Sequence, residues 1–130
     1  MEKRKLKTLV IDRSRWRRGA MATDSEPKGT TRLLNNKGFM CCLGFDALAC
    51  GLSEDQILGV TAPSLLIPKG RIDQGTHAEY VESRCGLCCK DTPVHSAMVA
   101  NDSDTISEAT REKRVRAALR KLGWDKVIFV

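Results

Sequence analysis

Residues 32–52 carry the most structured pattern of hydrophobic and polar positions in the chain. Residues 32–34 and 39–41 have the pattern of two short strands, and the Asn-Asn-Lys-Gly between them is typical of a turn, because Asn and Gly tolerate positive φ. The apolar spacing then becomes helical over residues 42–50, with Asp46 as its one charge. The pattern predicts a hairpin that leads directly into a short, mostly buried helix.

Spacing and capping residues predict the other elements. Apolar and β-branched side chains indicate a first strand over residues 3–12 and a last strand over residues 126–130. A Ser-x-x-Gln capping box predicts a short helix over residues 54–58, and a second serine cap predicts an amphipathic helix over residues 108–122. The remaining expectations are a mobile loop at 20–30, a helical turn at 64–67, an irregular segment at 69–92 and a helix at 93–100.

These elements predict an α+β fold in a single domain, residues 1–130. The expected sheet is small and mainly antiparallel, built from the N-terminal strand, the hairpin and the C-terminal strand, with short helices packed on one face. A hydrophobic content of 42% and a charged content of 29% are ordinary for a globular domain.

Composition also indicates a cellular compartment. No apolar run approaches the roughly 20 residues of a membrane helix, and the basic N-terminus is followed by no apolar signal region. We therefore expect a cytosolic protein with reduced thiols. In that setting the six cysteines are better explained as buried thiols or metal ligands than as a disulfide framework.

The net charge of +6 is unevenly distributed along the chain. Residues 1–18 carry eight basic against two acidic residues, residues 111–130 carry seven against two, and residues 41–110 carry four against ten. If the two terminal strands are neighbours, the basic ends merge into one positive face that can bind phosphates or a partner. The expected contact residues are Arg13, Arg15, Trp16, Arg17, Arg18, Lys113, Arg114 and Arg120, with Trp16 able to stack on a base. The competing interpretation is a solvated surface that keeps the protein soluble.

Two cysteine clusters are candidates for chemistry. Cys85, Cys88 and Cys89, with His77 or His95, have part of a zinc-site spacing, although a tetrahedral site needs four ligands and a second Cys-x-x-Cys is absent from the sequence. The alternative is a set of free thiols.

Cys41 and Cys42 begin a predicted helix, where a thiolate is favoured, and a histidine could act as their base. Their apolar flanks favour the other interpretation, two small core residues. Residues 101–105 are predicted to form a polar loop. Residues 101–104 resemble a calcium loop only superficially, and Asp102 and Asp104 are better explained as turn formers and caps.

Three pieces of the chain carry a resemblance: IDRSRWRRG (11–19), LLNNKGFMCCLGFDALACGLSEDQILG (33–59) and residues 100–130. With an IDRSxWxRG start and a CCLGF core motif, they resemble a family of small, largely uncharacterised bacteriophage proteins. The match covers about half of the chain, and residues 69–99 lie outside the pattern. The resemblance implies phage origin and action in the host bacterial cytoplasm.

Together these observations predict a small phage-encoded, non-enzymatic binding protein that acts on a host protein complex, with inhibition of a bacterial antiviral defence system as one such role. The alternative is a nucleic-acid or nucleotide-binding protein that uses the basic face, with zinc as a structural cofactor. An enzyme ranks third, because no set of nucleophile, base and orienting group can be assembled from the sequence. We expect no cofactor for the binding protein and no membrane association.

Overall fold

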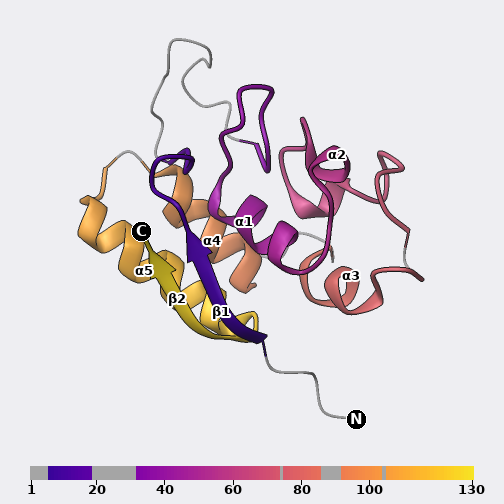
Figure 1. The fold of residues 1–130 in the computed structure, drawn as a ribbon. Helices are drawn as coiled ribbons and strands as arrows, with labels where there is room; N and C mark the ends of the chain where they lie inside the picture. Colours follow the sequence, from indigo (N-terminus) through magenta and orange to yellow (C-terminus); the bar gives the residue numbers. More distant parts are fainter. Residues whose placement is uncertain (1–5, 19–31, 74, 86–91, 104) are drawn as a thin grey trace.

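The computed structural model describes residues 6–18, 32–73, 75–85, 92–103 and 105–130 (Figure 1). Two strands, β1 (Leu6–Ile11) and β2 (Trp124–Phe129), form the sheet of the described residues. The helices are α1 (Cys42–Ala49), α2 (Glu54–Ile57), the 3₁₀ helix η1 (Pro63–Leu65), α3 (Ala78–Arg84), α4 (Pro93–Asp102) and α5 (Glu108–Lys121). None of the described helices is long and apolar enough to cross a membrane.

The two strands run parallel, contrary to the predicted fold class. Leu9 lies opposite Val127, and Ile11 lies opposite Phe129. The prediction of a mainly antiparallel sheet was therefore wrong, although the fold remains a small α+β arrangement. Parallel strands need a long crossover connection. Here the chain leaves β1, passes through all the helices and returns along the same direction into β2.

The predicted hairpin does not form a strand ladder. Backbone hydrogen bonds from Asn35 N to Phe39 O (2.9 Å) and from Cys41 N to Arg32 O (3.1 Å) close the loop. Its flanks, however, pair elsewhere through isolated parallel bridges, Leu34 with Leu58 and Met40 with Trp16. The loop therefore joins two distant segments, and only its turn matches the prediction.

Local capping explains where the helices begin. The Ser53 hydroxyl accepts from Gln56 N (3.3 Å) while the Gln56 amide oxygen accepts from Ser53 N (2.8 Å), so the predicted capping box is confirmed. The Ser107 hydroxyl accepts from Thr110 N (3.1 Å) at the start of α5. The helix predicted at 93–100 is also present and extends two residues further, whereas α3 forms inside the segment expected to be irregular. The loop predicted at 20–30 lies outside the described residues.

Helices cover one side of the sheet. The inward side chains of β1 and β2, such as Leu9 and Val127, are buried, and α1, α4 and α5 pack behind them (Figure 1). The opposite face carries Thr8, Val10, Lys126 and Ile128, and no described helix is drawn in front of it (Figure 1). We call these four residues the outer sheet face.

Candidate partner-binding surface

The described part of the basic N-terminal segment lies beside the C-terminal strand, which is the arrangement that the predicted basic face requires. Beyond the strand register, Arg13 N donates to Val130 O (2.8 Å) and Val130 N donates to Ile11 O (2.9 Å). The segment after β1 therefore runs against the end of β2 and beside α5. This juxtaposition brings the arginines of residues 13–18 next to the helix that was expected to complete a positive face.

Most of these arginines, however, are used inside the molecule. Arg13 binds Glu112 through two hydrogen bonds of 2.8 and 2.7 Å, and Arg18 donates to Glu108 at 2.5 Å. The hydrogen bond from Arg13 holds the pKa of Glu112 below its usual value. Partial burial acts to raise the pKa of Glu108, but hydrogen bonds from Arg18 and Arg111 lower it overall. Acidic residues of α5 thus neutralise the cations expected to bind phosphate.

Trp16 and Arg17 lie in the core. Trp16 is 3% exposed and packs against Phe129, with ring centroids 5.1 Å apart, while the Arg18 guanidinium lies 4.6 Å over its ring. Arg17 is likewise 3% exposed. Arg15 remains at the surface, where it donates to Gly38 O (3.1 Å) and approaches Glu54 at 3.5 Å. A base has no access to stack on the Trp16 ring in this arrangement.

Asn101 holds this segment in place. Its side-chain oxygen accepts from the Trp16 indole (2.7 Å) and from Cys42 N (2.9 Å), while its amide donates to Arg17 O (3.2 Å) and to Asp102 (3.0 Å). The sequence placed Asn101 in a polar loop, but it belongs to the last turn of α4 and is 1% exposed. It joins the turn after β1, the start of α1 and α4, which is a structural role.

The adjacent cysteines Cys41 and Cys42 are buried. Burial raises the pKa of Cys41 to about 12, and burial also raises the pKa of Cys42, which is fully enclosed and whose thiol faces Ala97 O at 3.7 Å. Although both residues lie at the start of α1, a thiol with a raised pKa is a poor nucleophile at neutral pH. Their positions match two small residues that let α1 pack closely.

Of the candidate zinc ligands Cys85, Cys88 and Cys89, the structure describes only Cys85. Cys85 follows α3, and burial raises its pKa to about 11; His77 precedes α3 and His95 lies in the first turn of α4. Cys88 and Cys89 lie outside the described residues. Within the described part of the chain, no group of three or more His, Cys, Asp or Glu side chains is placed to hold a metal ion. The zinc prediction stays a prediction.

A buried ion pair was missed by sequence reasoning. Arg84 of α3 donates to both carboxylate oxygens of Asp46 (2.9 and 2.7 Å), and the Trp124 indole donates to the same carboxylate (2.8 Å). Asp46 is 0% exposed. Its hydrogen bonds to Arg84 and Trp124 connect α1 to α3 and to β2. The available signal was the single charge within an apolar helix, since such a charge requires a partner when buried.

Next to this pair lies a groove of about 1520 Å³ between α3 and the end of α5. The Tyr80 hydroxyl in its wall is buried and has no hydrogen-bond partner among the described residues, and burial raises its pKa. The charged lining contains both signs: Lys7, Arg120 and Lys121 against Glu79, Glu82 and Asp125. The groove therefore does not select a ligand by charge.

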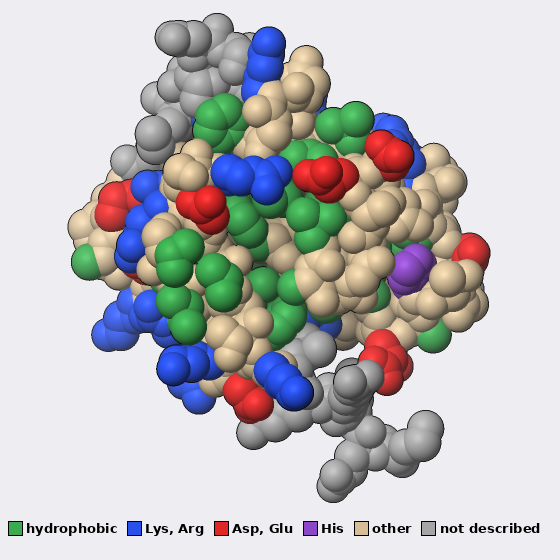
Figure 2. Space-filling model, viewed as in Figure 1, with side chains coloured by type: hydrophobic (Ala, Val, Ile, Leu, Met, Phe, Trp, Pro, Cys, Tyr) green, Lys and Arg blue, Asp and Glu red, His purple; other side chains and the backbone are tan. Residues whose placement is uncertain are grey.

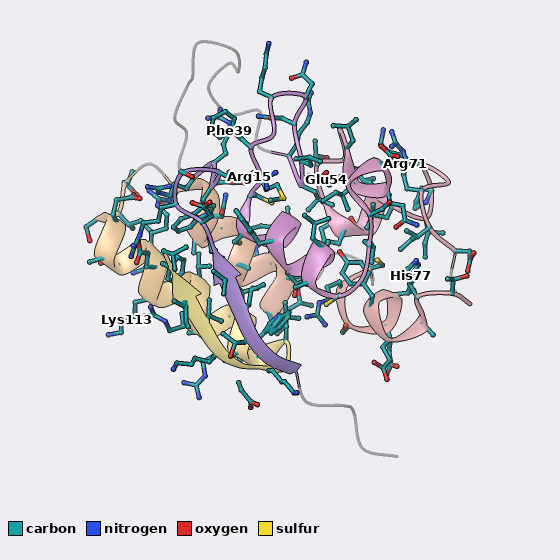
Figure 3. All side chains as sticks on the ribbon, in the orientation of Figure 1. Arg15, Phe39, Glu54, Arg71, His77 and Lys113 are labelled. Carbon is teal, nitrogen blue, oxygen red and sulfur yellow. The ribbon has the colours of Figure 1, made fainter. Side chains whose placement is uncertain are left out.

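Three exposed cations share one face of α5. Lys113, Arg116 and Arg120 are three and four residues apart, so they share a helix face. Arg116 donates to Val127 O (3.2 Å), which places this face along β2. We call these three residues the cationic stripe. Lys113 and Arg120, like Arg114 on the neighbouring face, make no hydrogen bond or ion pair within the described residues. Figure 3 shows Lys113 pointing away from the molecule.

The cationic stripe borders the outer sheet face. On that face Val10 is 49% exposed and pairs in register with the half-buried Ile128, and Val130 beyond them is 59% exposed. Figure 2 shows hydrophobic side chains on this side of the molecule, with Lys and Arg side chains along the edge that α5 occupies. An exposed apolar strip rimmed by cations is the arrangement found at protein interfaces.

The fold and this surface together define a small α+β arrangement in which no described helix covers one face of the sheet. No family model, no curated protein and no solved structure matches the chain. The argument for a function therefore starts from the surface itself.

Proposed function

We propose that this protein is a non-enzymatic binding protein that docks on a partner protein through the outer sheet face and the cationic stripe. The observation that carries the proposal is the uncovered face of a parallel sheet. Parallel sheets almost always have both faces covered, because their crossover connections place helices on the faces. Here one face leaves Val10 49% exposed. A partner that covers this face would complete the usual arrangement.

The resemblance to small phage proteins supports a partner in the host cell. We propose a host protein complex, and the role to test first is inhibition of a bacterial antiviral defence system. The buried thiols and the internally paired arginines support binding in preference to catalysis, since neither group is presented to a substrate. The site of action under this proposal is the host bacterial cytoplasm.

Binding of a nucleic acid or nucleotide is the competing function. It is favoured by Lys113, Arg114 and Arg120, whose charges are uncompensated within the described residues. It is disfavoured by the burial of Trp16 and by the ion pairs of Arg13 and Arg18. Salt separates the two functions, because phosphate binding weakens steeply with ionic strength whereas an interface with an apolar centre tolerates moderate salt.

The test is an affinity capture from bacterial lysate, with and without nuclease and across a salt series. The double variant Lys113→Glu/Arg120→Glu should lose the captured protein, while Lys37→Glu/Lys69→Glu, which reverses two exposed cations elsewhere, should retain it. Figure 3 shows Lys113 and Arg71 at opposite ends of the molecule. Capture that disappears with nuclease would favour the nucleic-acid function. Equal capture by both double variants would refute the proposed surface.

A further inference from the structure

The two long edges of the sheet can be distinguished by backbone direction. Val130 N donates to Ile11 O and Arg13 N donates to Val130 O, so the backbone groups of Ile11 and Arg13 point toward β2. The N–H and C=O groups of successive residues point to opposite sides of a strand. Those of Thr8 and Val10 therefore point away from β2. On β2 the same alternation directs the backbone N–H and C=O of Val127 away from β1, and its carbonyl meets Arg116 of α5.

The edge formed by β2 is closed. Arg116 of α5 donates to the outward carbonyl of Val127 (3.2 Å), and its guanidinium lies 5.2 Å over the ring of Phe129. A long side chain thus occupies the position at which another strand would pair. Covering an edge in this way prevents unwanted strand pairing.

At the edge formed by β1, no described side chain is bonded to the outward backbone groups, although α1 packs against this strand. Outside the pairing with β2, no hydrogen bond reaches the backbone of Thr8 or Val10. Both residues are exposed, and the six residues of β1 contain no proline and a single charge, Lys7. Proline, inward charges and covering segments are the usual protections of an edge strand. Thr8 and Val10 therefore present unpaired donors and acceptors in an extended geometry.

The charge of the surroundings favours an acidic occupant. The exposed acids of β1, α5 and β2 in the described residues are Asp125 and Glu108, and Glu108 binds Arg18 and Arg111. The exposed cations of the same three elements are Lys7, Lys113, Arg114, Arg116, Arg120, Lys121 and Lys126. A segment that carries Glu or Asp is attracted to this field, and a basic one is repelled.

We propose that an extended, acidic segment of the partner protein adds to the open edge of β1 as a third strand. This inference rests on the proposed function and names how the docking occurs. Backbone hydrogen bonds to Thr8 and Val10 would hold the segment. Lys7 of β1 and Lys126 of β2 are the nearest cations by strand position, and the cations of α5, beyond β2, would attract the carboxylates at longer range. A third strand would also extend cover over the exposed Val10 side chain.

One substitution tests the backbone bond alone. Val10→Pro removes the outward N–H of Val10 but takes no donor from the β1–β2 ladder, and proline is tolerated on an edge whose N–H faces solvent. Val10→Ala is the matched control, because it shortens the side chain and keeps the N–H. The probe is a fluorescent peptide in which Glu alternates with Val, and the comparison peptide has Lys in place of Glu. Binding is followed by fluorescence anisotropy.

We expect the acidic peptide to bind and the basic peptide to fail. Val10→Pro should weaken binding roughly tenfold or more, whereas Val10→Ala should change it only a few-fold. Circular dichroism checks the fold of each variant. Hydrogen exchange on the unmodified protein provides a second measurement: the amides of Thr8 and Val10 should slow when the acidic peptide is added.

Other outcomes overturn the inference in distinguishable ways. Strand addition is refuted if the acidic peptide does not bind. It is also refuted if Val10→Pro binds the peptide as well as the unmodified protein does and the amides of Thr8 and Val10 do not slow. If Lys113→Glu/Arg120→Glu still abolishes capture from lysate in that case, the proposed function stands and only the docking mode fails. If sedimentation shows self-association that Val10→Pro abolishes, the occupant is a second copy of this chain and the acidic partner segment is refuted.

Discussion

Gly44 offers a sharp test of the packing, because two general rules predict opposite signs for its replacement by alanine. Gly44 lies within α1, where helix propensity favours Ala over Gly by about 1 kcal/mol. An added Cβ, however, would collide with the carbonyl oxygen of Leu33 and lie 2.9 Å from the Cβ of Met40. Leu33 is itself held by a hydrogen bond to Val60 O (2.8 Å), so its backbone cannot easily retreat.

The magnitude follows from these contacts. Forcing a methyl group into a closely packed site costs about 1–3 kcal/mol, and a backbone obstacle places Gly44→Ala at the upper end. After subtraction of the propensity gain, we expect a loss of about 2 kcal/mol in the free energy of unfolding. For a chain of this length the melting temperature should fall by roughly 6–10 °C.

Urea and thermal unfolding, followed by circular dichroism, measure this loss. Gly75→Ala is the control, because its added Cβ would lie 3.6 Å from the nearest atom, an Asp73 carboxylate oxygen, at an exposed turn. The control should be neutral or slightly stabilising. A Gly44→Ala variant that melts at or above the temperature of the unmodified protein would show that propensity governs and that the close approach has no energetic weight.

Three further changes test the interior and the ion pairs. Arg84→Met strands the buried carboxylate of Asp46 and should cost about 3–5 kcal/mol, and the double variant with Asp46→Leu should recover part of that loss in a urea-unfolding cycle; simple additivity would contradict the coupling. Asn101→Leu leaves two buried N–H donors unbonded and should cost about 2–6 kcal/mol by the same assay, and a loss below that range would show that the donors find other partners. The hydrogen bond from Arg13 lowers the pKa of Glu112 from 4.5, so its contribution is present above pH 4.5 and is lost as the pH falls through the lower folded-state value. In acid titrations of stability, Glu112→Gln should flatten that loss, and an unchanged profile would refute the pairing.

Prediction from sequence succeeded where the determining contacts are local. The serine cap of α5 bonds a backbone group three residues away, so the pattern of residues contains both partners. The apolar flanks of Cys41 already indicated a buried thiol, and the burial that raises its pKa agrees with that interpretation. The adjacency of the chain ends was also predicted, from the positions of the terminal strands alone.

Prediction failed where partners lie far apart in the chain. Arg13 and Glu112 are separated by 99 residues, and nothing in the spacing of charges shows that one neutralises the other. The basic face was therefore predicted with arginines that the structure uses internally, and Trp16 was assigned to a surface from which the hydrogen bond to Asn101 removes it.

The amino-acid sequence by itself determined the helices with clear caps, the apolar character of the CCLGF segment and the concentration of basic residues at both ends. Tertiary structure alone decided the parallel direction of β1 and β2 and, within the part of the chain that is described, which cations remain unpaired and which edge of the sheet stays open. The physical reason is range. Capping and periodicity act within a few residues, whereas strand direction and ion pairing depend on how the intervening hundred or so residues pack and return.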